Sequence, residues 1–220
     1  MLYVVATPIG NLEDITLRAL RILKEADLIA AEDTRHSSII FQKYEIKKPM
    51  ISFHAWSDEH KLEQILGVLR EGKNVALICD AGTPGFSDPG YVLIKAAVAQ
   101  GIRVEPIPGP SAFLAALSAS GLPTHNFLFL GFLPIKKGRQ TLLTELKEEE
   151  RSIVFYESPH RLLKTLSELE KYFGERPLCI GREITKIHEE FFRGTSKEAY
   201  DYFSKKGVKG EFVLILGAMH

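Results

Sequence analysis

Short apolar runs alternate with amphipathic segments along the whole chain, as in proteins whose strands and helices follow one another in turn. The clearest helical period lies at 57–72, where Ser57 is expected to cap a helix. Its apolar positions are Leu62, Ile65, Leu66 and Leu69. Another helix is predicted at 16–26. Its expected apolar face consists of Leu17, Leu20, Ile22 and Leu23.

The alternation continues through two halves of the chain. In the first half, strands are predicted at 2–7, 28–33, 50–55, 74–80 and 103–108, and a further helix at 91–101. In the second half, strands are predicted at 127–132, 152–157, 178–183, 189–196 and 211–217, and helices at 111–120, 138–149, 160–173 and 197–206. A break in composition at 106–112 predicts an N-terminal α/β domain at 1–110 and a C-terminal α/β domain at 111–220. We expect a mainly parallel sheet in the first domain and a mixed sheet in the second.

The composition is that of an ordinary globular protein, with 220 residues, 45% hydrophobic and 25% charged, and no net charge. A neutral chain argues against a protein that only binds nucleic acid, because such proteins carry a basic surplus. No apolar run reaches the roughly 18 residues of a membrane span, and the N-terminus shows no signal-peptide pattern. Cys79 and Cys179 lie in apolar runs, which predicts buried thiols and a reducing, cytoplasmic location.

Three loops rich in glycine and proline follow predicted strands, at 6–16, 80–90 and 106–112. Any one of them can be a simple turn. In open α/β sheets, however, ligands bind beyond the carboxyl ends of the strands, and all three loops are expected at that edge. The sequence has no G-x-G-x-x-G, and its near match to a phosphate-binding loop at 67–73 lies at a helix end rather than after a strand. Acidic residues in the loops suit a cationic or hydroxyl-rich ligand better than phosphate.

Six ordered segments of the chain resemble one known family. They read VATPIGNLEDIT, AEDTRHS, DAGTPGFSDPGY, PIPGPSAFLAALSASGL, FYESPHR and REITKIHEEFFRG. The chain is similar to the small-subunit ribosomal RNA (16S) cytidine 2′-O-methyltransferases of the tetrapyrrole methylase superfamily. The resemblance implies two α/β domains with S-adenosylmethionine in the cleft between them, and a homodimer. Longer family members continue into a helical extension that this chain is expected to lack.

The resemblance also implies which residues bind S-adenosylmethionine. In the first domain these are Pro8, Asp80, Ala81, Gly82, Gly85, Ser111 and Ala112. In the second domain they are Tyr156, Arg182 and Gly210.

The segment at 31–37 follows a predicted strand at the same sheet edge and brings together residues for the acceptor chemistry. A ribose 2′-hydroxyl must lose its proton to become a good nucleophile, so a base is expected. Asp33 is our first choice. The candidate catalytic residues are Asp33, Glu32, Arg35 and His54. The same segment also fits a helix start capped by Asp33 or Thr34.

Several basic residues are candidates for RNA contact. His160 and Arg161 lie at a predicted helix start, where free amides favour phosphate, although Arg161 can instead pair with Glu157. Trp56 can stack on a flipped base or serve as a core anchor. The remaining candidates are Lys136, Lys137, Arg139 and Lys186, although such basic runs are usually solvated surface.

Alternative functions remain open at this point. The histidines and cysteines show no metal-ligand spacing, so no metal site is expected. A methyltransferase acting on a tetrapyrrole-like small molecule would need a broad apolar pocket rather than a basic surface. A non-catalytic, ribosome-associated protein that binds S-adenosylmethionine would keep the donor loops without turnover.

Overall fold

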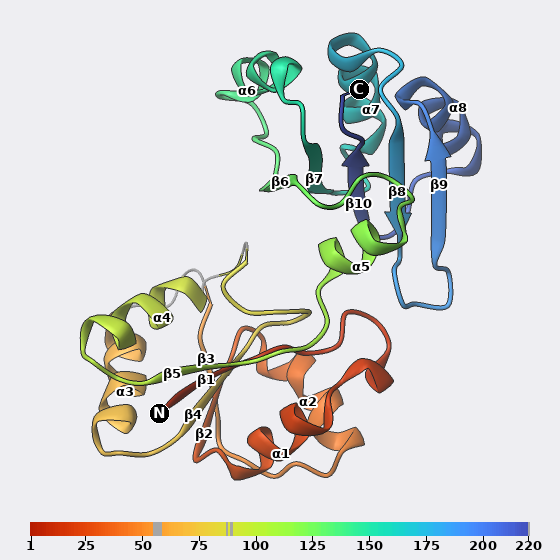
Figure 1. Ribbon diagram of the computed structural model, residues 1–220. Coiled ribbons are helices and arrows are strands. Elements are labelled where there is room, and N and C mark those ends of the chain that lie inside the picture. Colours follow the sequence, from red (N-terminus) through yellow and green to blue (C-terminus); the bar gives the residue numbers. More distant parts are fainter. Residues whose placement is uncertain (55–58, 87, 89, 220) are drawn as a thin grey trace. The chain divides into compact units, whose positions relative to one another are not determined.

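The computed structural model describes residues 1–54, 59–86, 88 and 90–219. The chain divides into two compact units, residues 1–111 and 112–220. Each unit contains one sheet with helices packed against it (Figure 1). The expected cap Ser57 and the stacking candidate Trp56 lie outside the described residues.

The first unit is built on a parallel sheet with the strand order β3–β2–β4–β1–β5. Its described strands are β1 (Leu2–Val5), β2 (Leu28–Ala31), β3 (Met50–Ser52), β4 (Val75–Ile78) and β5 (Val104–Ile107). Its described helices are the 3-10 helix η1 (Leu12–Asp14), α1 (Leu17–Glu25), α2 (Thr34–Lys43), α3 (Glu59–Arg70) and α4 (Gly90–Ala99). Helices α1 and α2 pack on one face of the sheet, and α3 and α4 on the other, which makes three layers.

Two details of this unit differ from the sequence-based expectation. Helix α2 was not among the predicted helices, although the alternative of a helix start capped by Asp33 is what the structure shows. The assignment of Leu17 to a buried face is wrong, because this side chain is 87% exposed. A helix turns by about 100° per residue, so Leu17 lies about 120° around the axis from the buried Leu23.

The second unit is built on a mixed sheet with the order β6–β7–β10–β8–β9, in which only β6 and β7 pair in parallel. Its described strands are β6 (Phe127–Phe132), β7 (Ser152–Glu157), β8 (Leu178–Arg182), β9 (Glu190–Gly194) and β10 (Phe212–Leu216). Its described helices are α5 (Ala112–Ala119), α6 (Arg139–Glu145), the 3-10 helix η2 (Leu146–Glu148), α7 (Leu162–Phe173) and α8 (Ser196–Lys206). Both predicted sheet types are confirmed.

The two faces of the second sheet are covered differently. Helices α6, α7 and α8 bury their apolar residues on one face, around Phe155 and Leu214. On the other face, α5 packs against β7 and β10. There Phe113 stacks on Phe129 of β6, with ring centroids 4.3 Å apart. Aromatic side chains therefore line the α5 face of this sheet.

Both cysteines are free and buried, as predicted. Burial raises the pKa of the Cys79 thiol, and burial likewise raises that of Cys179. Among the described helices, none combines the length and the apolar character that a membrane crossing requires.

Candidate functional site

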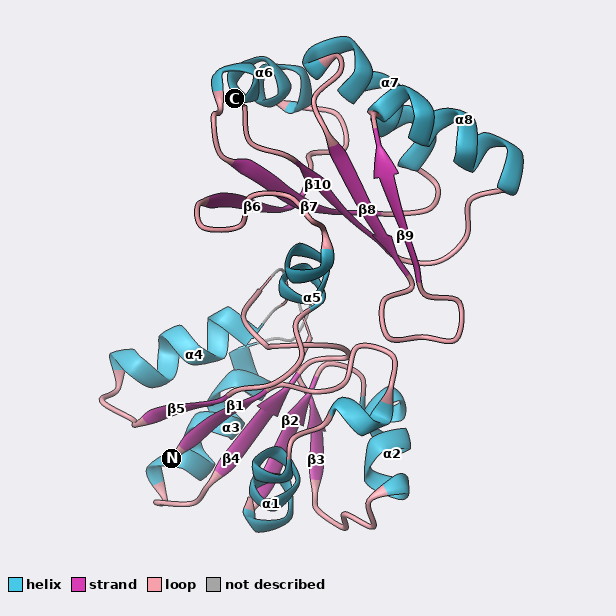
Figure 2. Ribbon diagram, turned by 45° about the vertical axis from the view of Figure 1, so that its right-hand side comes forward, coloured by secondary structure: helices cyan, strands magenta, loops and turns pink. Residues whose placement is uncertain are grey.

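The three glycine-rich loops of the first unit meet at the carboxyl ends of β4, β1 and β5, which are neighbours in the sheet (Figure 2). The Thr7 amide donates to the Gly82 carbonyl at 2.8 Å, and the Gly82 amide donates back to the Thr7 carbonyl at 3.0 Å. The Thr83 hydroxyl donates to the Pro110 carbonyl at 3.1 Å. The loop after β4 is thus hydrogen-bonded to both of its neighbours.

The packing of these loops leaves little room for side chains. Gly82 has a φ of +87°, and a Cβ there would lie 3.4 Å from Ile9 and 3.7 Å from the Pro110 carbonyl oxygen. At Gly109, a Cβ would lie only 2.8 Å from the Cβ of Ala6. Pro8 is also buried in this packing, whereas Ala81 is exposed. At position 82 the positive φ favours glycine, whereas at position 109 the close approach of Ala6 leaves no room for a Cβ.

Asp88 closes the loop between β4 and α4. Its two carboxylate oxygens accept from the Gly85 amide at 2.9 and 2.8 Å, and Oδ1 also accepts from the Gly90 amide at 2.7 Å. Gly90 is the first residue of α4, so Asp88 satisfies an amide that the helix start would leave unpaired. This structural role was not predicted, because Asp88 lies two residues before the first residue of α4, whereas a capping side chain usually comes directly before it.

Glu32 and Asp80 bring two further carboxylates to the same edge. The Asp33 amide donates to Asp80 Oδ1 at 3.0 Å, and the Asp80 amide approaches Glu32 Oε2 at 3.4 Å. Burial raises the pKa of Glu32, and the negative charges of Asp80 and Asp88 add to the rise. The Asp80 amide and the charge of His54 act in the opposite direction. Glu32 is therefore a carboxylate whose ionisation is disfavoured by its surroundings.

Asp33 has a different environment. It caps α2 by accepting from the Arg35 amide at 2.8 Å, and it also holds the Arg35 side chain, with Nε at 3.2 Å and Nη2 at 2.8 Å. The hydrogen bonds from the Arg35 guanidinium lower the pKa of Asp33 to about 2. Arg35 itself points into solvent, with its side chain 90% exposed. Asp33 is thus a stably ionised helix cap.

Ser111 and Ala112 lie where the two units join, since Ser111 ends the first unit and Ala112 begins α5. In the second unit, Arg182 and Gly210 are neighbours, because Arg182 Nε donates to the Lys209 carbonyl at 2.7 Å. Gly210 has a φ of +96°, and a Cβ there would lie within 2.8 Å of Glu183.

Tyr156 is separated from Arg182 by the sheet itself. Tyr156 lies opposite Val213 of β10, whereas Arg182 lies opposite Phe212. Successive residues of a strand point to opposite faces, so Tyr156 and Arg182 are on opposite faces of the sheet. Tyr156 belongs to the aromatic face, with its ring centroid 5.4 Å from that of Phe129. The structure therefore does not gather the three candidates of this unit on one surface.

Among the basic candidates, the expectation that Arg139 adds to an exposed basic loop is wrong. Arg139 is only 4% exposed, and its guanidinium donates to Glu168 and to the Thr165 hydroxyl, both at 2.7 Å. The positive charge of Arg139 is therefore paired with Glu168 inside the unit. The sequence gives no sign of this, because both partners lie more than 20 residues away along the chain.

The other basic candidates divide into two groups. Arg161 pairs with the buried Glu157 at 3.2 Å, and Lys186 lies between Glu183 at 2.9 Å and Glu211 at 2.8 Å. Lys136, Lys137 and His160 are exposed. The side chains of Arg161 and Lys186 are only partly exposed and held in ion pairs, whereas those of the second group are exposed.

A cavity of about 320 Å³ lies elsewhere in the second unit. Its lining residues are Lys147, Tyr172, Phe173, Arg176, Pro177, Ala218 and Met219. None of the residues predicted to bind a ligand lines it. Over the residues that the structure describes, there is also no cluster of histidine, cysteine or acidic side chains able to hold a metal ion.

Solved structures show where this architecture recurs. The fold matches a cobalt precorrin-4 methyltransferase of cobalamin biosynthesis with a TM-score of 0.71 and 20% identity, over 98% of this chain and 94% of that chain. It also matches a uroporphyrin-III C-methyltransferase from Thermus thermophilus, solved with S-adenosylhomocysteine, with a TM-score of 0.67 and 21% identity, over 98% and 96% of the two chains. At these identities the likeness is one of fold.

Other relatives have a much higher sequence identity to this chain than these solved structures do. The chain is 51% identical to the ribosomal RNA small subunit methyltransferase I of Thermotoga maritima over 98% of this chain and 97% of the relative. It is 50% identical to the protein of the same name from Synechocystis over 98% and 78% of the two chains. The family model described as tetrapyrrole (corrin/porphyrin) methylases matches residues 1–200. The chain therefore belongs to the tetrapyrrole methylase family, alongside these ribosomal RNA small subunit methyltransferase I relatives.

Proposed function

We propose that this chain transfers a methyl group from S-adenosylmethionine to the ribose 2′-hydroxyl of a cytidine in the 16S RNA of the small ribosomal subunit. The observation that carries this proposal is the 51% identity to the Thermotoga maritima ribosomal RNA small subunit methyltransferase I, which extends over 98% of this chain. The corrin and porphyrin enzymes are only 20–21% identical. RNA is therefore favoured over a macrocycle as the substrate.

The loop edge of the first unit suits this donor. The sulfonium of the donor is cationic, and Glu32, Asp80 and Asp88 supply negative charge near the same strand ends. The positive φ values of Gly82 and Gly85, +87° and +93°, let bare backbone approach a ligand closely. We assign donor contacts to Pro8, Asp80, Ala81, Gly82, Gly85 and Ser111 of the first unit, and to Ala112, the first residue of the second unit. In the second unit we also assign a donor contact to Tyr156 and not to Arg182, which lies on the opposite face of the sheet, or to Gly210 beside Arg182.

On the acceptor side, Glu32 is better suited than Asp33 to take the 2′-hydroxyl proton. A general base works best when its pKa lies near the working pH. The pKa of Glu32 is raised, whereas that of Asp33 is held at about 2 by Arg35. The donor supplies a methyl group on a positively charged sulfur. As the ribose oxygen forms its bond to the methyl carbon and the carbon–sulfur bond breaks, the hydroxyl proton passes to the Glu32 carboxylate.

The remaining candidates of this region have supporting roles in the proposal. Asp33 starts α2 and holds Arg35, whose exposed guanidinium is available for a phosphate of the substrate. His54 lies close enough for its charge to lower the pKa of Glu32, so it helps to keep that carboxylate ionised. His54 is also the alternative base.

For the RNA surface we propose Lys136, Lys137 and His160, which are exposed. Arg161 and Lys186 are engaged in ion pairs within the unit, so we expect them to act on RNA by shaping the surface rather than by direct contact. The two free thiols agree with a reducing compartment, and we infer a cytoplasmic location, where small subunits are present.

Methyl transfer from labelled S-adenosylmethionine tests the proposed function. The purified chain is incubated with small subunits, with free 16S RNA and with a panel of tetrapyrroles, and the label is located by nuclease digestion and mass spectrometry. We expect label on a cytidine ribose in the RNA. Label on a macrocycle would contradict the RNA substrate, and tight donor binding without any transfer would point to the non-catalytic alternative.

The donor site is tested by a pair of glycine variants. Gly82→Ala and Gly101→Ala place a side chain at φ values of +87° and +69°, so both strain the backbone, but only Gly82 lies in the proposed donor loops. We expect Gly82→Ala to weaken donor binding by about tenfold, equivalent to ~1.4 kcal/mol. Gly101→Ala should bind like the parent protein in titration calorimetry. Equal affinities in the two folded variants would remove Gly82 from the site.

The base is tested by the pH dependence of single-turnover methylation. Because the pKa of Glu32 is raised above its ordinary 4.5, the rate should rise with pH as this carboxyl ionises, and it should fall at lower pH. Glu32→Gln should lower the rate by about 10²- to 10⁴-fold and abolish this limb. Asp33→Asn should keep the limb, because a group with a pKa of about 2 is ionised throughout. A limb that survives in Glu32→Gln would contradict the assignment of the base to Glu32.

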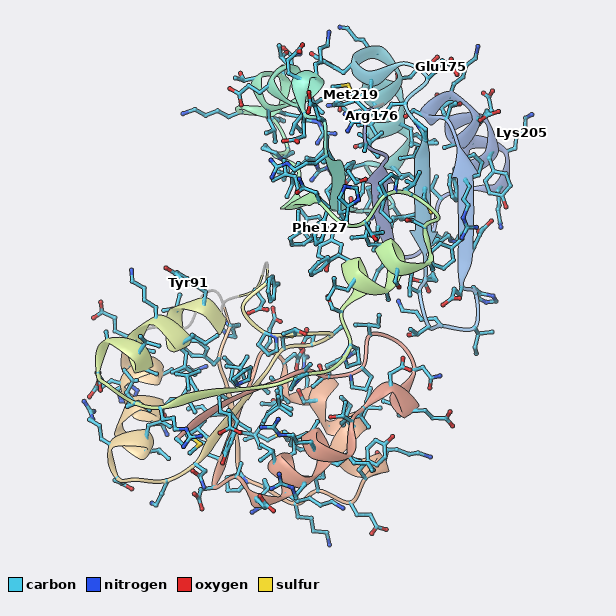
Figure 3. The ribbon with its side chains drawn as sticks, in the orientation of Figure 1. Tyr91, Phe127, Glu175, Arg176, Lys205 and Met219 are labelled. Carbon is cyan, nitrogen blue, oxygen red and sulfur yellow. The ribbon has the colours of Figure 1, made fainter. Side chains whose placement is uncertain are left out.

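We also propose that the chain forms a homodimer. In support, helix α4 exposes Tyr91, Val92 and Val98, which are 60%, 50% and 60% exposed, and Tyr91 extends outward from the helix (Figure 3). Light scattering should give twice the chain mass of 24.7 kDa, and Val98→Glu should shift the protein toward monomer. A parent protein that stays monomeric at micromolar concentration would exclude the dimer.

A further inference from the structure

The connection from β6 to α6 presents an exposed surface that is both apolar and basic. Phe132 is 55% exposed and Ile135 is 68% exposed, although both are large apolar side chains. Lys136 and Lys137 follow directly and are exposed as well. We call residues 132–137 the β6–α6 tip. Exposed aromatic and basic side chains in one short segment are typical of surfaces that bind single-stranded nucleic acid.

The backbone of the tip is held in place by two arginines. Arg139 Nη1 donates to the Pro134 carbonyl at 3.0 Å, and Arg161 Nη2 donates to the Leu133 carbonyl at 2.8 Å. The Leu133 side chain is buried in the core of the unit. The exposure of Phe132 and Ile135 is therefore set by a well-anchored backbone rather than by a loose loop.

The arginines are in turn held by buried acceptors. Glu157 is only 2% exposed, and its two oxygens contact Arg161 at 3.2 Å and the Thr165 hydroxyl at 2.6 Å. That hydroxyl accepts from Arg139, which also binds Glu168. Buried charges are costly unless fully paired, so this network fixes one geometry for the tip. A surface fixed before binding loses less entropy when a partner binds.

Phe132 also lies beside a residue of the proposed donor site. It pairs in register with Tyr156, and the two ring centroids are 5.4 Å apart. Both belong to the aromatic face of the sheet, where Phe129 contacts Tyr156 as well. A flat group that stacks on Phe132 would therefore lie next to Tyr156.

We propose that Phe132 is a base-stacking residue of the RNA site, on which an unstacked base of the substrate packs. Ile135 covers the edge of that base, and Lys136 and Lys137 contact the adjoining phosphates. This inference rests on the proposed function, because it assumes an RNA substrate. RNA fits the tip better than an apolar protein partner, since the exposed Lys136 and Lys137 follow the exposed aromatic residue within five positions. RNA-binding modules commonly stack splayed bases on aromatic side chains.

The test is a set of steady-state measurements with small subunits. Phe132→Ala should lower kcat/KM by about 5- to 150-fold, the fold-change that corresponds to loss of one stacked base. Phe132→Trp should restore activity to near the parent value. Phe132→Leu, which keeps an apolar side chain without an aromatic plane, should remain impaired. Donor affinity should be unchanged in all three variants, because Phe132 contacts the RNA.

A matched control and a salt series separate stacking from other effects. Tyr200→Ala removes another exposed aromatic side chain, on α8 of the same unit, and should retain parent activity. Lys136→Ala with Lys137→Ala should flatten the dependence of KM on salt, whereas Phe132→Ala should leave that slope intact.

Several results would overturn the inference. One is parent-level activity in Phe132→Ala, and another is equal activity in Phe132→Leu and Phe132→Trp. A loss of donor affinity in Phe132→Ala as large as its loss of kcat/KM, or a change in its oligomeric state, would also overturn it. If the parent protein does not methylate small subunits at all, the proposed function fails instead. The two failures are therefore distinguishable.

Discussion

The pairing of the Thr7 and Gly82 backbones is the interaction on which the rest of the site depends. A parallel sheet places the ends of β4, β1 and β5 side by side, but it does not decide how the loops beyond them are arranged. Two reciprocal hydrogen bonds, at 2.8 and 3.0 Å, extend the contact past the strand ends. Gly82 can take part only because it adopts a φ of +87°, which other residues rarely adopt. The glycine-rich loop thus forms a defined backbone surface at the sheet edge.

Most of the charged residues discussed above stabilise the fold, and one of them, Glu32, is a candidate for chemistry. Asp33 and Asp88 accept hydrogen bonds from amides at helix starts, and Arg139 and Arg161 donate to backbone carbonyls of the β6–α6 tip. Glu32 differs from these, because its partners do not compensate for its burial. A carboxylate that is neither a cap nor fully paired is a better candidate for chemistry than one that is stabilised as an ion.

Much of the fold could be predicted from the sequence because strands and helices leave distinct periods. The strands at 127–132 and 152–157 agree with the predicted bounds, and the alternation of elements gave the right sheet types. Helix α2 was predicted only as an alternative helix start at Asp33, because its polar segment places only Ser37, Ile40 and Phe41 inward. The buried role of Arg139 was beyond prediction, because its partners on α7 are near only after folding.

For the candidate site, sequence patterns predicted the three loops and their meeting edge, since parallel strands fix that geometry. They did not distinguish Asp33 from Glu32. The pKa values of the two adjacent acids differ because hydrogen bonds from Arg35 lower that of Asp33, whereas burial and then the charges of Asp80 and Asp88 raise that of Glu32. Exposed aromatic residues such as Phe132 were likewise invisible, because an apolar run gives no sign of which residue remains outside the core.

The most direct test of the account is a crystal structure of the chain with S-adenosylhomocysteine. We expect the ligand to lie against the backbone of 80–85 and 109–111, with Glu32 near the position of the sulfur. A ligand bound elsewhere, for example in the cavity beside Lys147 and Arg176, would contradict the assignment of the loops at the sheet edge to the donor.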